Sequence, residues 1–450
     1  MSIATELTNY QTYLTNAYTK AQQKNATIPQ NKNLQNLTAT IDSLQANSVD
    51  SKDVDFIDYD GTILYSYTAQ EFANLTQLPP NPSHPGLTAE GWNWTLADAK
   101  ALVQKTGFMD IGQCYVTTDE KTHVYITLEE PLTILSYIYA EGSVTIDWGD
   151  GATETKTGTS ATDVISFQHT YITAGNYCIK YTIDENGYAL IKGTSNSQLI
   201  SCDGSNNFDF YRGIIRKIEI GKRMGVMDYA FTNMHNLEAV TFPATDPSAQ
   251  MLAGYKKLGT YSFAYDGKLK AVVIPPWITG LTTYVFSYSG VQKVSINKET
   301  TQASSYCFQY ALSLKRIAMP TNTEWGTSMT GMFRYCRGIE RIGLTKEYSS
   351  NNAVVGQYAF QYCQSLKKIK FPKDVSQISS NVFASCYSLA EIDFSDNTSV
   401  PSLGTATSIT GSTPTSMKII VPDNLYDTWI TTSPWNTSGL VGRIIKKSQA

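Results

Sequence analysis

The sequence predicts a mainly β, multidomain protein whose second half is a capped repeat solenoid. A phenylalanine-anchored motif returns there in steps of mostly 22 to 27 residues, with one longer step. A fixed period of this length indicates stacked structural repeats, in which each copy packs on its neighbours. Upstream, residues 122–193 alternate apolar and polar side chains as half-buried strands do. The anchoring residues are Phe231, Phe263, Phe286, Phe308, Phe333, Phe360 and Phe383.

The composition excludes several classes of function. Only 16% of the 450 residues are charged and the net charge is −4, so no surface for nucleic acid is expected. No apolar run approaches the roughly 20 residues of a membrane-spanning helix, and the start MSIATELTNYQ lacks a secretory signal pattern. We therefore expect synthesis in a cytoplasm and no membrane insertion. The 29 tyrosines fit either packing within the repeats or an amphipathic binding surface.

Residues 1–50 predict a helical segment for anchoring or oligomerisation. Leu7, Leu14 and Tyr18 recur at helical spacing, and a second short helix begins near Leu34. Neither helix is long enough to be stable alone. Their apolar faces therefore need a partner, which is another copy of the chain, a larger assembly or the protein's own next domain.

Residues 51–120 predict a small α+β module with a Pro/Trp-rich loop. The pattern gives a β-hairpin, a proline-rich loop over Trp92 and Trp94, and a helix from about Leu96 to Lys105.

Two interpretations fit the run Asp58-Tyr59-Asp60-Gly61-Thr62 in this module. It resembles the nucleophile loop of haloacid-dehalogenase-type phosphatases, where one Asp is the nucleophile and a second is the general acid beside Mg²⁺. That chemistry also needs alternating strands and helices, whereas prolines, two tryptophans, one helix and all-β sequence follow here. Asp-Gly is equally the signature of a tight hairpin turn, and we favour this second interpretation.

Residues 121–200 predict a β-sandwich. The segment contains Val144-Thr145-Ile146-Asp147-Trp148-Gly149-Asp150-Gly151, then His169-Thr170-Tyr171 and Ala174-Gly175-Asn176-Tyr177. These motifs resemble the PKD domain (polycystic-kidney-disease-type), an immunoglobulin-like β-sandwich. The resemblance implies a spacer or a weak binding module. Trp148 is expected in the core between the sheets, His169 is expected to order a turn, and Asp147 and Asp150 either cap turns or hold a cation.

Residues 201–412 carry the repeats, and the clearest copy reads YAFQYCQSLKKIKFP from Tyr358. This pattern resembles leucine-rich repeats of the BspA type. The resemblance implies one short parallel strand and one turn-like crossover in each copy. Long insertions after Pro243 and Leu344 are expected to loop out from one side. The side chains expected to point inward in the clearest copy are Phe360, Cys363, Leu366, Ile369 and Phe371.

The seven cysteines indicate neither disulfides nor a metal site, because they are odd in number and dispersed. Cys336, Cys363 and Cys386 each follow the repeat phenylalanine by three residues. Other copies place Met234, Asp266, Ser289 and Ala311 there. A position that accepts these residues is predicted to be a small stacking site in the interior.

Residues 413–450 predict a cap that closes the open end of the solenoid. The pattern gives a last strand from Met417 to Val421 and a short helix from about Asn424 to Thr431. Tyr426, Trp429 and Trp435 are the expected packing residues. A cap is needed because an open end would expose core and sheet edge.

We predict that the protein is not an enzyme and has no catalytic, cofactor-binding or metal-binding residue. His84, His123, His169 and His235 are scattered over different modules, and the common catalytic motifs are missing. Carboxylates from different repeats could still meet on the surface, as in glycosidases, so an enzyme stays an open alternative.

The order of modules suggests an anchor, a stalk and a binding head. The main hypothesis is a non-enzymatic bacteriophage virion protein, tail- or fibre-associated and released by lysis, because the N-terminal segment resembles the starts of phage tail-associated proteins. Its N-terminal segment would bind other virion proteins or form a homo-oligomer, and its repeats would bind a cell-surface protein or glycan. The first alternative is a bacterial BspA-type adhesin at the extracellular cell surface. The second alternative is a virion decoration protein without a receptor role.

Overall fold

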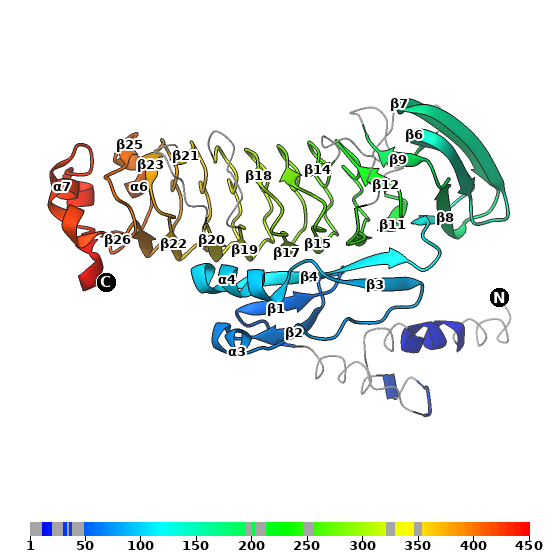
Figure 1. The fold of residues 1–450 in the computed structure, drawn as a ribbon, viewed down its shortest axis with the longest axis horizontal. Coiled ribbons are helices and arrows are strands. Elements are labelled where there is room, and N and C mark those ends of the chain that lie inside the picture. The colour runs from blue at the N-terminus through cyan, green and yellow to red at the C-terminus, as the bar shows by residue number, and fades with distance from the viewer. Residues whose placement is uncertain are drawn as a thin grey trace.

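The computed structural model describes residues 11–19, 30–33, 36–37, 49–193, 200–202, 213–246, 256–320, 329–345 and 353–450. Figure 1 shows a long solenoid with the C-terminal cap at one end and a strongly curved sheet at the other. A small α+β module lies along one side of the solenoid. Residues 11–19 are helical, and the Tyr18 hydroxyl donates to Asn33 O at 2.7 Å. The remainder of the predicted N-terminal helical segment lies largely outside the described residues.

The α+β module has a four-stranded sheet with the order β2-β1-β4-β3. The two central strands, β1 and β4, are parallel, and both outer pairings are antiparallel. Helix α4 lies at the position predicted from the sequence, and it begins after Thr95, whose side chain accepts a hydrogen bond from the Asp98 N–H. The helix ends at Gly107, which has a φ of 75°. The elements are β1 (Val54–Ile57), β2 (Ile63–Tyr67), α3 (Ala69–Ala73), β3 (Leu87–Trp92), α4 (Leu96–Thr106) and β4 (Met109–Thr117).

The curved sheet begins where this module ends. Two strands dominate it, β6 with 16 residues and β7 with 19. Because β6 is so long, its first half pairs with β10 and its second half with β8 and β9, while β7 runs along its whole length. The strands are β5 (Thr122–Leu128), β6 (Leu132–Asp147), β7 (Thr153–Tyr171), β8 (Gly175–Ile183), β9 (Tyr188–Ile191) and β10 (Ile200–Cys202).

The expected separate sandwich of residues 121–200 is not what the structure shows. Strand β5 pairs with the first strand of the solenoid, β11, and β9 pairs with β12, so one hydrogen-bonded sheet runs from this module into the repeats. The module therefore caps the solenoid rather than acting as a stalk. Trp148 is buried as predicted, although not between the sheets of a separate sandwich, and His169 Nε2 lies 2.7 Å from Asp150 beside the turn. Asp147 and Asp150 cap the turn by accepting hydrogen bonds from Gly149 N and Ala152 N.

The solenoid has about eight turns and two ladders of short strands. Neighbouring strands that hydrogen-bond within the repeats are parallel. The first ladder, here called the strand face, contains β11 (Ile215–Glu219), β13 (Ala239–Thr241), β15 (Ala271–Val273), β17 (Lys293–Ser295), β19 (Arg316–Ala318), β20 (Arg341–Gly343), β22 (Lys368–Lys370), β24 (Glu391–Asp393), β26 (Lys418–Val421) and β27 (Ile444–Lys446). The second ladder contains β12 (Met224–Val226), β14 (Lys257–Leu258), β16 (Gly280–Leu281), β18 (Gln302–Ala303), β21 (Ala353–Val355), β23 (Val375–Ile378) and β25 (Ser402–Leu403).

Turn segments that carry the repeat phenylalanines form a further side of the solenoid. The phenylalanine rings are buried and stack from coil to coil, for example 5.5 Å apart between Phe263 and Phe286 and 5.3 Å between Phe286 and Phe308. All five side chains predicted to point inward in the copy from Tyr358 are buried. Much of the two predicted insertions after Pro243 and Leu344 lies outside the described residues.

The C-terminal cap has the predicted strand and helix. Trp429 and Trp435 are fully buried, with ring centroids 5.4 Å apart, and both rings contact Phe394 of the last coils. The elements of this end are α6 (Thr407–Thr410), η2 (Asp423–Leu425), α7 (Tyr426–Thr431), α8 (Ser438–Val441) and η3 (Lys447–Gln449). Within the described ranges, no helix is long and apolar enough to cross a membrane.

Candidate binding surfaces of the solenoid

The strand face is covered by the α+β module over its central coils. Strand β4 lies against β13, β15, β17 and β19. The contact is close enough to require glycine at Gly112, because a Cβ added there would lie 2.4 Å from a methyl group of Val273. Asn93 donates to the carbonyl oxygens of Ile274 and Ser295 at 3.0 and 3.1 Å, and Trp94 donates to Ile296 O at 2.8 Å. The proline-rich loop was predicted to lie over both Trp92 and Trp94. This is correct for Trp92, whose indole N–H donates to Pro79 O, whereas Trp94 packs against the solenoid.

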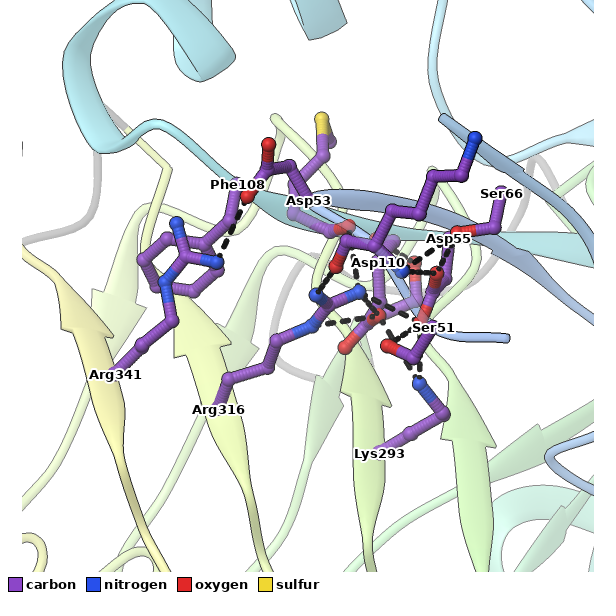
Figure 2. Close-up of polar contacts among 12 residues, drawn as sticks. Ser51, Asp53, Asp55, Ser66, Phe108, Asp110, Lys293, Arg316 and Arg341 are labelled. Atoms are coloured by element: carbon purple, nitrogen blue, oxygen red, sulfur yellow. Dashed lines mark hydrogen bonds and ion pairs between the residues drawn. The ribbon is translucent and has the colours of Figure 1, made fainter. Parts of the chain in front are cut away.

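A buried cluster of charges joins the two parts (Figure 2). Arg316 Nη2 lies 2.8 Å from Asp55 and 2.7 Å from Asp110, and Lys293 Nζ lies 2.7 Å from Asp55. The carboxylates come from β1 and β4 of the module, while the cations come from β17 and β19 of the solenoid. Burial raises the pKa of Asp55, but the charges of Arg316 and Lys293 outweigh it and hold that pKa below its usual value. The module is therefore fixed to the strand face by paired, desolvated charges.

The turn of the Asp58-Tyr59-Asp60-Gly61-Thr62 run has a structural role. Asp58 N donates to Thr62 O at 2.9 Å, and Gly61 has a φ of 88°, which is the geometry of a tight hairpin turn. The Asp58 carboxylate accepts a hydrogen bond from the Tyr115 hydroxyl at 2.8 Å and lies 2.6 Å from His84 Nε2. The hydrogen bond with Asp58 raises the pKa of His84. The favoured interpretation as a hairpin turn is confirmed.

The other histidines stay in separate places. His123 lies between Asp119 at 2.9 Å and Glu219 at 3.3 Å, and His235 Nδ1 lies 3.1 Å from Tyr265 O. In the part of the chain that the structure describes, no group of three or more His, Cys, Asp or Glu residues could hold a metal ion.

The repeat cysteines form a buried column of free thiols. The Sγ atoms of Cys336, Cys363 and Cys386 each donate to the carbonyl of the preceding coil's phenylalanine, at 2.9, 3.1 and 3.0 Å. Burial raises the pKa of the Cys386 thiol to about 12. The prediction of a small interior stacking position is confirmed.

The turn segments present two rows of stacked tyrosines, and we call this side the turn face. In the first row, ring centroids of successive tyrosines lie 4.8 to 5.3 Å apart. In the second row they lie 4.2 to 4.9 Å apart, with interplanar angles of 6° to 12°. The first row contains Tyr229, Tyr261, Tyr284 and Tyr306, with Tyr358 after a gap, and the second contains Tyr265, Tyr288, Tyr310, Tyr335 and Tyr362.

The second row holds tyrosine where the backbone favours other residues. Its members have φ between 58° and 67°, the left-handed region, which costs an ordinary side chain about 1 to 2 kcal/mol. The equivalent positions at the two ends of the row are Asn233 and Ser385, with φ of 61° and 63°. The fold therefore accepts small polar residues at this position. The backbone conformation does not explain five consecutive tyrosines, so we attribute them to ring stacking or to function.

The first row is interrupted at Gly331, and Arg334 fills the gap. The Arg334 guanidinium carbon lies 4.6 Å from the Tyr358 ring centroid and 5.1 Å from that of Tyr335. Its Nε donates to Gln361 Oε1 at 2.7 Å. The guanidinium therefore joins the two rows where a tyrosine is missing.

Gly331→Ala should lower the free energy of unfolding by about 1 to 3 kcal/mol, as measured by chemical denaturation. The new Cβ would lie 2.3 Å from the Tyr306 ring, and the φ of 56° is unfavourable for alanine. Gly442→Ala is the matched control, because no atom lies within 4 Å of the added Cβ and its φ is −72°. Equal stability of the two variants would contradict the close packing of Tyr306.

The parallel ladders and the buried phenylalanine stack define a leucine-rich-repeat solenoid. Residues 204–339, 256–389 and 329–407 match the family model described as BspA type leucine-rich repeat region (6 copies). The matched residues, under half of the chain, are thus similar to BspA-type leucine-rich repeats. No curated protein matches the chain. The comparisons lend no support to the PKD-like or phage resemblances.

Two solved structures are similar to part of the chain. A leucine-rich repeat protein from Bacteroides ovatus is 18% identical with a TM-score of 0.30, over 51% of this chain and 66% of that protein. The chain thus spans just under two thirds of that protein's length. A leucine-rich cell-surface protein from Faecalibacterium prausnitzii is 19% identical with a TM-score of 0.30, over 54% of this chain and 80% of that protein.

Proposed function

We propose that this protein is a non-enzymatic cell-surface binding protein that contacts its target through the turn face of its repeats. The BspA-type match supports this function better than the virion protein that the N-terminal resemblance suggested. One observation carries the choice of surface: the α+β module covers the centre of the strand face, whereas the tyrosine rows of the turn face are partly exposed.

The chemistry of the turn face supports a role in binding. Tyrosine offers apolar contact area and a polar group at a small cost in conformational entropy. Tyr265 and Tyr288 are 40% and 44% exposed although both belong to a stacked row. Assembly through the N-terminal segment, as a homo-oligomer or with other proteins, remains a separate proposal.

Binding of the fluorescently labelled full chain to intact bacterial and epithelial cells tests the proposal. We expect saturable binding that a triple variant, Tyr265→Asn, Tyr288→Asn and Tyr310→Asn, reduces at least about tenfold. Asparagine is the residue that this fold already carries at Asn233 in the same left-handed conformation. The variant should therefore fold as well as the natural chain.

The double variant Lys368→Ala and Lys370→Ala is the matched control for the strand face. Both lysines lie on β22, and their side chains are 68% and 51% exposed. We expect this control to bind cells like the natural chain. If the lysine variant loses binding while the asparagine variant keeps it, the strand face is the binding surface and the proposal is wrong.

A further inference from the structure

We infer that the turn face binds a linear, uncharged polysaccharide that runs along the solenoid axis and pairs with the hydroxyl groups of the tyrosine rows. The inference rests on the proposed function and names the class of ligand.

The stacking of the rings decides which atoms face the ligand. Within the second row the rings lie nearly parallel, at 6° to 12°, with centroids 4.2 to 4.9 Å apart. Each interior ring therefore has both faces covered by its neighbours. Only ring edges and hydroxyl groups remain for a ligand, so a sugar ring cannot lie flat on an interior tyrosine. The surface is a row of hydroxyl groups rather than a row of aromatic platforms.

These hydroxyl groups are available. In the described part of the chain, the hydroxyl of no row tyrosine forms a hydrogen bond with another protein group. Burial and neighbouring tyrosines raise the pKa of Tyr261 and Tyr284, so these phenols stay neutral and can donate. A phenol both donates and accepts hydrogen bonds, as do the hydroxyl groups of a sugar. The rows therefore repeat, coil after coil, a group that a polysaccharide chain also repeats.

The backbone of the turn face argues against an extended peptide as the ligand. The N–H groups of Tyr265, Tyr288 and Tyr310 donate to carbonyls of the next coil at 3.0, 2.9 and 2.8 Å. Those of Tyr335 and Tyr362 do the same at 2.7 and 2.9 Å. Strand addition needs unpaired backbone groups on the receiving surface. The turn face offers side-chain hydroxyl groups instead.

The charge of the turn face argues against a polyanion. The residues just before the first-row tyrosines Tyr261 and Tyr284 carry hydroxyl groups, namely Thr260, Thr282 and Thr283. Among the described residues, the cation that contacts the row rings is Arg334, which already contacts two tyrosine rings and Gln361. A polyanion needs cations along its whole length, whereas an uncharged chain of hydroxyl groups does not.

Affinity electrophoresis of the full chain tests the ligand class. The gels contain a mixed-linkage β-glucan, a mannan or a dextran as uncharged chains, hyaluronan as a polyanion, or gelatin as a protein. We expect at least one uncharged polysaccharide to retard the protein, with little change when salt is added. A triple variant, Tyr288→Phe, Tyr310→Phe and Tyr335→Phe, keeps the rings and removes three hydroxyl groups. Its Kd should rise about 10- to 100-fold.

The double variant Tyr13→Phe and Tyr387→Phe is the control, since both tyrosines are exposed and lie outside the rows. It should bind like the natural chain. Retention of full affinity by the triple variant, retardation by none of the uncharged chains, or binding to hyaluronan or gelatin alone overturns the ligand class. In those cases cell binding that the asparagine variant reduces at least about tenfold still supports the proposed function. A chain that binds neither cells nor polysaccharides disproves both.

Discussion

Replacing Arg316 with methionine should lower the free energy of unfolding at pH 7 by about 3 to 5 kcal/mol, because one partner of a buried charge cluster is removed. The side chain of Arg316 is 8% exposed, and it pairs with Asp55 and Asp110, whose side chains are 0% and 2% exposed. After the substitution Lys293 alone faces two desolvated carboxylates. Guanidinium denaturation of the full chain measures the effect, and limited proteolysis shows whether the α+β module leaves the solenoid.

Lys368→Met is the matched control on the same strand face, because that lysine pairs with Glu391 while 68% exposed. An exposed ion pair contributes little to stability, so the free energy of unfolding should not change measurably.

The pH dependence of stability gives a second test of the Arg316 cluster. The pKa of Asp55 is lowered in the native chain, so its contribution is present above its unfolded pKa and is lost as the pH falls through the folded pKa. The gap in unfolding free energy between Arg316→Met and the natural chain should therefore narrow as the pH falls below the usual carboxyl pKa of 3.8. A gap that stays constant in this acid range contradicts the pairing.

Replacing Asp266 with cysteine should raise the free energy of unfolding at pH 7 by about 1 to 3 kcal/mol, the cost of a buried unsatisfied polar group. Asp266 occupies the cysteine column and is fully buried. One carboxylate oxygen accepts from Met234 N at 2.9 Å, and the other has no partner among the described atoms. A cysteine here would place its Sγ as in Cys336, which donates to the preceding coil's Phe308 O.

The variant Asp266→Asn keeps the shape of the side chain but removes its titratable carboxyl group, so it isolates the effect of charge. Burial raises the pKa of Asp266 well above its usual value. Its contribution to stability is therefore fully present below the unfolded pKa and is lost as the pH rises through the folded pKa. Above pH 4 both variants should gain stability relative to the natural chain, and the gain should grow with pH. Thermal unfolding at pH 4 and pH 7 measures the difference. An equal gain at both pH values contradicts the protonation of Asp266.

The repeat region was predictable because its information is local and periodic. The phenylalanines, the cysteine column and the terminal tryptophans each occupy a position fixed by the coil just before or after, so their spacing in sequence sets their neighbours in space. The strands of residues 122–193 were predictable as strands for a similar reason. Their pairing was not, because alternation shows which side chains share a face but not which strand lies beside them.

The tyrosine rows were visible as a composition but not as a surface. Their number left packing and binding open, and only the left-handed φ values and the stacking geometry show which ring faces are covered. A signal was nevertheless present: tyrosine recurs two residues after the phenylalanine in five successive copies.

By itself the sequence determined the solenoid, its interior columns and its C-terminal cap. Only the tertiary structure decided which face of the solenoid is free, because the α+β module docks through pairs such as Asp110 and Arg316, which lie 206 residues apart. Asp55 within an apolar strand and Arg316 at the start of a repeat strand each look like ordinary polar residues in the sequence. Their role in docking depends on the desolvation of both charges and on their mutual attraction. Both effects arise only when two distant parts of the chain come together.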